Sequence, residues 1–189
     1  MNKSALRKVY KEKRLLLTNE IMRSYDEQIL SRIKEYQFKT PTYFLSYFPI
    51  AHHHEPDTKL VTNYIKKQFI GTTLCYPRIN ETSGLMDAIA LNEATIFNKN
   101  NYHISEPANG EIIPADKINI ILVPLLAFDI QGHRIGYGKG FYDKYMANCN
   151  SNTLKIGLSY FPPIDIIDDA NEYDIPLNLC FTPSDVYEF

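Results

Sequence analysis

The segment 124–145, PLLAFDIQGHRIGYGKGFYDKY, combines residue types that are suited to holding phosphate. Its glycines follow one another closely: Gly132, Gly136, Gly138 and Gly140. Glycine permits positive φ and close backbone approach, so the amide N–H groups of such a loop can surround an oxyanion. Arg134 and Lys139 add positive charge. From Phe141 onward the sequence favours a helix, whose N-terminus would face the same anion.

Asp143 lies three residues after Gly140, in the first turn of that expected helix, where it could hold a divalent cation beside phosphate. Two familiar phosphate loops do not fit. The Walker A spacing places His133 where the first glycine is required, and Gly140 where Ser or Thr is required. The dinucleotide fingerprint fails because Asp143 occupies its last glycine position. The pattern leaves open another phosphate-binding loop or a glycine-rich turn with a solvated lysine.

Several regular elements are expected to position this segment. Residues 118–123, INIILV, are nearly all apolar and β-branched, which predicts a central strand covered on both faces. Helices are expected over Ser4–Leu17, after Thr18 as N-cap, and after Thr58 as N-cap. Further strands are expected at Tyr43–Phe48, at Thr72–Tyr76 ending at Pro77, and at 85–91, Lys155–Tyr160 and Leu177–Phe181. Asn98–Pro114 lacks apolar periodicity and is expected to be a long surface loop.

Strands that alternate with helices predict an α/β fold, a three-layer α/β/α sandwich around a largely parallel sheet. A length of 189 residues suits a single domain, 1–189. The net charge of −2 gives no general attraction for nucleic acid or anionic lipid. The longest apolar run, Ile118–Ala127, is too short to span a membrane, and the N-terminus lacks a secretory signal. Three widely spaced cysteines indicate reduced thiols, so we expect a cytoplasmic location.

The stretch VPLLAFDIQGHRIGYGKGFYDKY, residues 123–145, closely resembles the signature of 5-formyltetrahydrofolate cyclo-ligases, also called methenyltetrahydrofolate synthetases. Other segments resemble the same family in the expected order: KSALR at 3–7, FLSYF at 44–48 followed by EPDT at 55–58, LCYPRI at 74–79, ISEP at 104–107 and EYDIPLNLCFTPSDV at 172–186. The central motif is specific. The other segments are individually weak and jointly strong, and together they cover almost the whole chain.

The resemblance implies a role for each matching residue. ATP would be bound by Lys3, Arg7, Arg134, Ile135, Gly136, Tyr137, Gly138, Lys139, Gly140, Phe141 and Tyr142. The folate would be bound by Leu45, Glu55, Tyr137, Gly138, Lys139, Gly140 and Phe141. Lys139 and Arg134 would be catalytic, and Asp143 and Asp174 would hold Mg²⁺. Without the resemblance, the basic N-terminus indicates a solvated helix face, and Asp174 a surface aspartate before a turn.

The chain departs from the family pattern in two places. Additional residues between Ser46 and Glu55 include Pro49 and His52–His54. Three adjacent histidines suggest a metal site, but neighbours in a loop point in different directions, which favours a solvated or pterin-adjacent loop. Tyr102 stands where the family has tryptophan, and it could stack on the folate or cover the core.

The activity implied by the resemblance is ATP-dependent cyclisation of 5-formyltetrahydrofolate. The formyl oxygen would attack the γ-phosphate of ATP, N10 would add to the activated carbon, and phosphate would leave to give 5,10-methenyltetrahydrofolate and ADP. Such chemistry needs positioning and charge rather than a side-chain nucleophile. We expect a monomer with these small-molecule partners and Mg²⁺. Two alternatives are a sugar-phosphate isomerase-like enzyme and a non-catalytic protein that binds folate or RNA.

Overall fold

A computed structural model gives the structure of residues 1–80, 82–100 and 104–189. An eight-stranded sheet with the order β12-β11-β10-β7-β1-β2-β3-β6 forms its centre. The inner strands are parallel: β1 (Tyr43–Leu45), β2 (Thr73–Asn80), β7 (Ile120–Val123), β10 (Leu154–Leu158) and β11 (Leu179–Phe181). The outer strands are antiparallel: β3 (Leu85–Ala90), β6 (Ile112–Ile113) and β12 (Val186–Glu188). The sheet is therefore largely parallel, as predicted.

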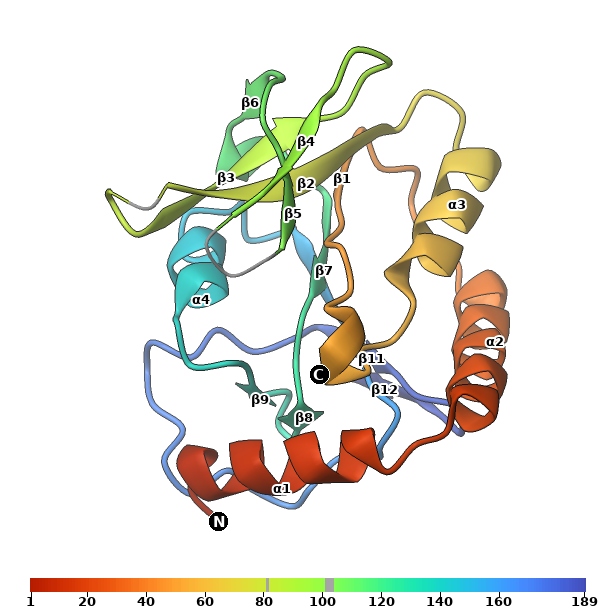
Figure 1. The fold of residues 1–189 in the computed structure, drawn as a ribbon, viewed down its shortest axis with the longest axis vertical. Helices are drawn as coiled ribbons and strands as arrows, with labels where there is room; N and C mark the ends of the chain where they lie inside the picture. Colours follow the sequence, from red (N-terminus) through yellow and green to blue (C-terminus); the bar gives the residue numbers. More distant parts are fainter. Residues whose placement is uncertain (81, 101–103) are drawn as a thin grey trace.

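Helices cover both faces of this sheet (Figure 1). The α-helices of the described residues are α1 (Lys3–Leu15), α2 (Asn19–Glu35), α3 (Thr58–Gln68) and α4 (Phe141–Met146), and their 3₁₀ turns are η1 (Ala51–His53) and η2 (Ala115–Lys117). Ile33 of α2 and Val61 of α3 share one core cluster with Leu122 of β7. On the opposite face, Met146 of α4 shares a second cluster with Val123. This arrangement confirms the predicted three-layer sandwich.

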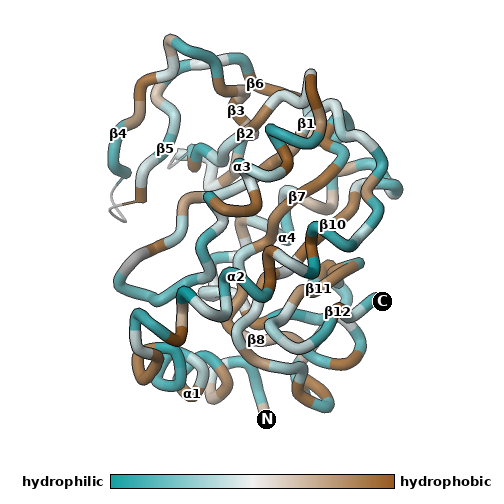
Figure 2. The backbone as a smooth tube through the Cα atoms, turned by 90° about the vertical axis from the view of Figure 1, so that its right-hand side faces the viewer, coloured by the Kyte–Doolittle hydropathy of each residue, from teal (hydrophilic) through white to brown (hydrophobic). Residues whose placement is uncertain are grey.

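The central strand β7 is buried along its whole length, which agrees with its apolar, β-branched sequence. Figure 2 shows hydrophobic residues along β7 and hydrophilic residues near β4. Two short hairpins lie outside the main sheet: β4 (Phe97–Lys99) with β5 (Ser105–Pro107), and β8 (Ala127–Phe128) with β9 (Arg134–Ile135). Helix α1 packs on the second hairpin, because Leu6 and Ile135 belong to one buried cluster.

Several expected element ends are wrong, among them that of β1, which ends at Leu45 rather than at Phe48. Two of the differences have a visible cause. The N-cap of α3 is Asp57, whose carboxylate accepts the Lys59 N–H at 2.9 Å, whereas the Thr58 hydroxyl donates to the Tyr47 carbonyl at 2.6 Å. Strand β2 continues past Pro77 to Asn80. Because β1 ends opposite Cys75, the missing N–H of Pro77 has no β1 residue to pair with on that side. The cap at Thr18 is confirmed, with its hydroxyl accepting the Ile21 N–H at 3.2 Å.

The segment Asn98–Pro114 is not the loop that was expected, since its described residues include β5, β6 and the end of β4. These strands have only two or three residues each, too few for a periodic apolar pattern. Side-chain hydrogen bonds to the backbone help to hold the hairpin: Asn109 accepts the Ile96 N–H at 2.7 Å. Of the helices in the described ranges, none has the length and apolar composition needed to cross a membrane.

Candidate active site

The glycine-rich segment leaves the carboxyl end of β7, folds into the β8–β9 hairpin and passes into α4. The hairpin turn is fixed by Asp129, a fully buried carboxylate that accepts the N–H groups of Gln131 and His133 at 3.0 and 2.9 Å. Beyond β9, Gly138 and Gly140 have φ of 88° and 71°, values that strain any other residue. The glycines therefore fix the loop in a left-handed conformation at two points.

This loop forms one wall of a cavity of about 500 Å³ at the carboxyl edge of the parallel strands. The other walls come from α1, from residues 47–55 after β1, and from β2, β3 and β5. Cationic and acidic groups lie at the α1 and α4 side of the cavity, and Glu55 lies with aromatic rings at another side. The predicted segment and the N-terminal helix, more than 100 residues apart in sequence, thus share one site.

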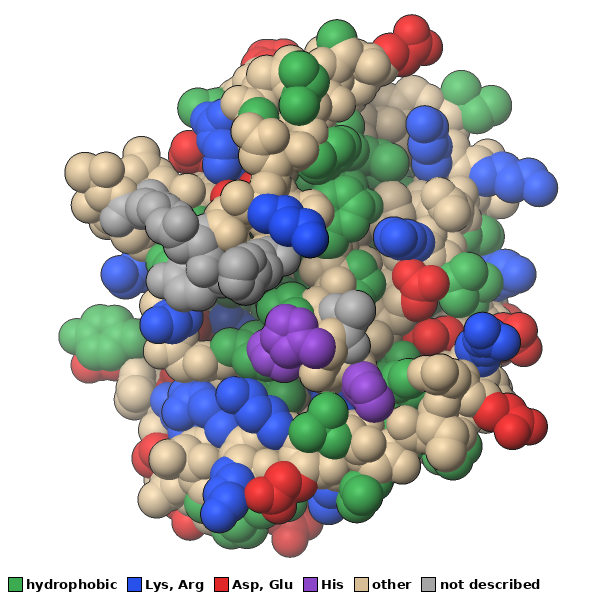
Figure 3. Space-filling model, in the orientation of Figure 1, with side chains coloured by type: hydrophobic (Ala, Val, Ile, Leu, Met, Phe, Trp, Pro, Cys, Tyr) green, Lys and Arg blue, Asp and Glu red, His purple; other side chains and the backbone are tan. Residues whose placement is uncertain are grey.

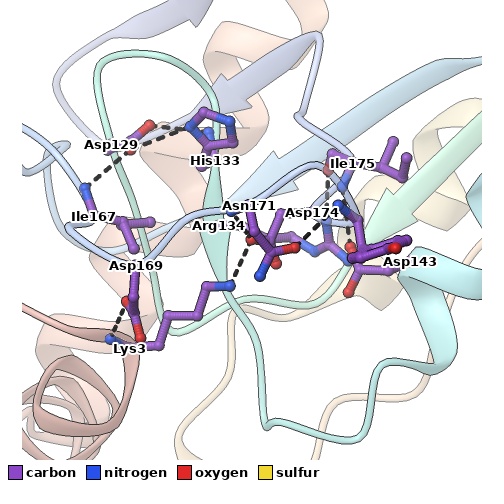
Figure 4. Close-up of polar contacts among 11 residues, drawn as sticks. Lys3, Asp129, His133, Arg134, Asp143, Ile167, Asp169, Asn171, Asp174 and Ile175 are labelled. Carbon is purple, nitrogen blue, oxygen red and sulfur yellow. Dashed lines mark hydrogen bonds and ion pairs between the residues drawn. The ribbon is translucent and has the colours of Figure 1, made fainter.

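Two ion pairs occupy the α1 and α4 side of the cavity (Figure 4). Lys3 Nζ lies 2.5 Å from Asp174 Oδ2, and Arg134 Nη2 lies 2.9 Å from Asp143 Oδ1. The Ile175 N–H also donates to Asp143 Oδ1, at 3.2 Å, which ties the segment carrying Asp174 to the first turn of α4. Burial raises the pKa of Asp174, but hydrogen bonds from Lys3 and the Asn171 N–H outweigh it, and the pKa lies below its ordinary value.

Helix α1 presents a row of cations to the same cavity at a spacing of four residues, namely Lys3, Arg7 and Lys11. Arg7 Nε donates to the Gly136 carbonyl at 2.9 Å, so its guanidinium lies against the glycine loop. Lys139 is exposed and lines the cavity from the loop itself. Figure 3 shows Lys and Arg side chains gathered over α1, below the histidines. This side of the cavity therefore has the charge that a polyphosphate requires.

A buried carboxylate marks the other side. Glu55 is 7% exposed; its Oε1 accepts the Tyr137 hydroxyl at 2.5 Å and its Oε2 accepts the Ile50 N–H at 2.6 Å. Burial raises the pKa of Glu55, although these hydrogen bonds and the charge of Arg14 oppose the rise. His53 stacks on the Tyr137 ring with centroids 4.9 Å apart. Burial, with His52 and Lys11 nearby, lowers the pKa of His53 to about 4, so its ring is neutral at pH 7.

Residues 1–179 match the model of the 5-formyltetrahydrofolate cyclo-ligase family. The chain belongs to this family of ligases. It is similar to the 5-formyltetrahydrofolate cyclo-ligases of Mycoplasma genitalium, with 35% identity over 65% of this chain and 79% of the relative, and of Mycoplasma pneumoniae, with 28% identity over 95% and 97%. The NMR structure of Aquifex aeolicus 5,10-methenyltetrahydrofolate synthetase is similar in fold, with a TM-score of 0.75, 26% identity, and coverage of 100% of this chain and 93% of that one.

Most residues to which the resemblance to the cyclo-ligase family gave a role line this one cavity: Lys3, Arg7, Glu55, Arg134, Gly136, Tyr137, Gly138, Lys139, Gly140, Phe141, Tyr142, Asp143 and Asp174. Two do not. Leu45 is fully buried within β1, in the core cluster that contains Ile121 and Val123. Ile135 is fully buried under α1. Neither side chain offers a surface to a ligand, because each belongs to the apolar packing beneath the cavity.

Three further residues of this family member were not singled out from its sequence: Glu106 and Lys11 line the cavity, and Arg14 is buried and does not line it. Glu106 of β5 is 8% exposed and lines the cavity, where it accepts the Ile79 N–H at 3.2 Å. It lies within the ISEP segment that resembles the family, and that match was the signal available. Lys11 could have been found from its spacing after Lys3 and Arg7. Arg14 had no local signal, because its burial depends on tertiary packing.

Asp143 and Asp174 are the residues that could hold the Mg²⁺ expected from the resemblance, although in this structure each is paired with a cation, Arg134 and Lys3. Mg²⁺ is often held by one or two carboxylates together with substrate phosphates, and both carboxylates line the cavity beside the cations. The histidines do not form a metal site: in the described ranges, 1–80, 82–100 and 104–189, no three His, Cys, Asp or Glu side chains converge as ligands. Tyr102 lies outside the described residues.

Proposed function

We propose that this chain catalyses the Mg-ATP-dependent cyclisation of 5-formyltetrahydrofolate to 5,10-methenyltetrahydrofolate, with release of ADP and phosphate. The observation that carries the proposal is a single cavity that joins a cationic, glycine-lined phosphate side to a buried carboxylate, Glu55. Membership of the cyclo-ligase family, with residues 1–179 matched, supports the same reaction.

The phosphates of ATP would lie against the loop 136–140 and the cations of α1. Lys3, Arg7 and Lys139 supply charge, and the left-handed glycines let backbone N–H groups approach the phosphate oxygens. Arg134, which is held by Asp143 and the Ile175 carbonyl, is a rigid donor at the same place. Phosphoryl transfer requires mainly this positioning and charge stabilisation.

The pterin would lie at the Glu55 side. Its aminopyrimidinone edge carries N–H donors that match a carboxylate, and the Tyr137 hydroxyl and Ile50 N–H fix the orientation of Glu55. The Tyr137 and Phe141 rings line the same cavity and provide apolar surface for the ring system. One substrate would therefore be recognised by charge and the other by a buried, oriented acceptor.

The chemistry follows from bringing the two substrates together. The formyl oxygen attacks the γ-phosphorus and ADP leaves; N10 then adds to the activated formyl carbon and releases its proton to solvent, and the former formyl oxygen departs within inorganic phosphate. Asp143 and Asp174 would hold Mg²⁺, which when bound neutralises phosphate charge. The cations of the loop and α1 stabilise the charge on the transferring group. No protein nucleophile is needed.

We further propose that the enzyme works as a monomer in the cytoplasm. The three cysteines are all free in the structure, and two of them, Cys75 and Cys180, are buried. Burial raises the pKa of the Cys180 thiol, which keeps it protonated and unreactive. Reduced thiols of this kind suit a reducing compartment.

The test is incubation of the purified chain with 5-formyltetrahydrofolate and Mg²⁺, with and without ATP. Methenyltetrahydrofolate absorbs in the near ultraviolet, so an increase that requires ATP supports the proposal. ADP and phosphate should form in equal amounts with it. Absorbance that stays flat in the presence of both substrates would refute the proposal.

A further inference from the structure

Arg14 differs from the other cations of α1, because its side chain is completely buried and does not line the cavity. Its Nη2 donates to the Leu125 carbonyl, and its Nη1 donates to the Tyr137 hydroxyl at 3.3 Å. Within the described ranges, no carboxylate lies within ion-pair distance of this guanidinium. A buried charge is costly unless its surroundings compensate it, so its position calls for an explanation.

Arg14 is connected to the Glu55 carboxylate through the Tyr137 hydroxyl. Tyr137 receives a hydrogen bond from Arg14 and donates its own proton to Glu55 Oε1 at 2.5 Å. The backbone of Arg14 contributes as well, because its carbonyl lies 3.0 Å from His54 Nδ1 and holds the histidine segment against the end of α1. His53 of that segment stacks on Tyr137. Arg14 therefore contacts, from outside the cavity, both Tyr137 and the histidine segment that surround Glu55.

We propose that Arg14 is a positioning residue: its guanidinium orients the Tyr137 hydroxyl and, through it, the Glu55 carboxylate that accepts from the pterin. This inference rests on the proposed function, in which Glu55 binds the folate. Arg14 itself touches neither substrate. Its effect should appear in folate binding and leave the phosphate side, with Arg7 and Lys139, largely unchanged.

The charge of Arg14 also has a predictable effect on titration. Burial raises the pKa of Glu55; hydrogen bonds from the Ile50 N–H and the Tyr137 hydroxyl lower it, followed by the charge of Arg14 and the nearby His52 ring. The other ionisable groups that face this carboxyl are the hydroxyls of Tyr47, Tyr137 and Tyr142, which stay neutral because burial raises the pKa of each. Removal of Arg14 should therefore raise the pKa of Glu55 further. As the pH is lowered, the variant should then lose folate binding at a higher pH than the wild-type chain does.

A structural role alone predicts something else. If Arg14 only fastens α1 to the Leu125 carbonyl, its loss would loosen the helix that also carries Lys3 and Arg7. The KM values for ATP and folate would then rise together, and the pH profile would not move. Arg32 of α2 gives a matched control, because its Nε donates to the Pro183 carbonyl at 3.0 Å, away from the cavity.

The experiment compares Arg14→Met with Arg32→Met in the absorbance assay. For Arg14→Met we expect the KM for 5-formyltetrahydrofolate to rise about 10- to 100-fold, as for loss of a hydrogen bond within a charged network, with the KM for ATP nearly unchanged. The acid limb of kcat/KM for folate should move to higher pH, because the charge of Arg14 lowers the pKa of Glu55. Arg32→Met should change neither quantity. An unchanged folate KM, or an equal rise in both KM values with an unmoved limb, overturns the inference.

A second variant covers the case in which Arg14→Met does not fold. Arg14→Lys keeps the positive charge but lacks the planar guanidinium, whose two terminal N–H groups bond to the Leu125 carbonyl and the Tyr137 hydroxyl. It should raise the folate KM in the wild-type background and have no further effect in Tyr137→Phe, because Arg14 acts through that hydroxyl. Independent, additive effects overturn the inference. If the wild-type chain has no ATP-dependent turnover, the proposed function fails and this inference fails with it. If the wild-type chain turns over and the Arg14 variants have its folate KM and pH profile, only this inference is overturned.

Discussion

Gly138 offers a sharp test of the phosphate side. Its φ is 88°, and a Cβ placed on it would lie 3.3 Å from Arg7 Cζ and 3.4 Å from Arg7 Nε. Gly71, between α3 and β2, has nearly the same φ of 92° and no heavy atom within 4 Å of such a Cβ. Gly71 lies at the amino end of β2, whereas the cavity is at the carboxyl edge of the parallel strands. Alanine therefore adds similar backbone strain at both positions, but only at position 138 does its Cβ come close to another residue, Arg7.

The magnitudes follow from this difference. A left-handed backbone costs a residue with a Cβ about 1–2 kcal/mol, so both variants should lose about that much unfolding free energy. Only Gly138→Ala also pushes the Arg7 guanidinium, whose Nε bonds to the Gly136 carbonyl at 2.9 Å. A hydrogen bond to a charged group contributes about 1.5–3 kcal/mol. Arg7 must give way by a few tenths of an ångström, so if it holds phosphate from this position we expect part of such a bond to be lost and the KM for ATP to rise about 3- to 10-fold.

The assay pairs urea unfolding with steady-state kinetics at varied ATP. Gly71→Ala should be less stable and have the wild-type KM for ATP, whereas Gly138→Ala should be less stable and bind ATP poorly. A wild-type KM for ATP in Gly138→Ala would show that the loop and Arg7 do not hold the phosphates. A similar loss in Gly71→Ala would show that strain, rather than the Arg7 contact, is responsible.

Three further predictions use the same assays. Lys139→Ala should lower kcat by about 10²–10³ with an unchanged circular dichroism spectrum, and near-normal turnover would rule out its role on the transferring phosphate. Glu55→Gln should raise the KM for folate by about 10- to 100-fold and spare that for ATP, since a carboxylate acceptor is lost; equal effects on both would contradict this. Burial raises the pKa of Asp26 to about 6, so its ionised form destabilises the fold above that pH and the cost disappears toward pH 4. Asp26→Asn should therefore raise the unfolding free energy by about 1 kcal/mol at pH 7.5, allowing for solvent screening, and a gain that persists at pH 4 would contradict the assignment.

Much of the fold could be predicted because local patterns and tertiary packing agree. The apolar run 118–123 contains β7, and Thr18 caps α2 as expected. The β4–β5 hairpin could not be predicted, since strands of three residues carry no periodicity and depend on side chains such as Asn109 for support. Asp57 and Thr58 are both good N-caps by residue type, and only the distant Tyr47 carbonyl decides between them.

Part of the candidate site could also be predicted from local sequence patterns, and part depends on tertiary contacts. The glycines and cations of 134–143 could be recognised because their chemistry requires a local spacing, and most of them line the cavity. Leu45 lies outside the cavity lining: the residues after β1, from Tyr47 on, line the cavity, whereas Leu45 is fully buried in the core cluster with Ile121 and Val123. The position of Arg14 depends on Leu125 and Tyr137, more than 100 residues away. No local pattern encodes such a contact.

The pairing of Lys3 with Asp174 joins positions 171 residues apart. During synthesis the N-terminal helix emerges long before Asp174, its partner. A nascent chain can therefore begin to build its sheet while its phosphate side is still incomplete. If this side holds nucleotide as proposed, the nucleotide can stabilise it only after Asp174 has been made.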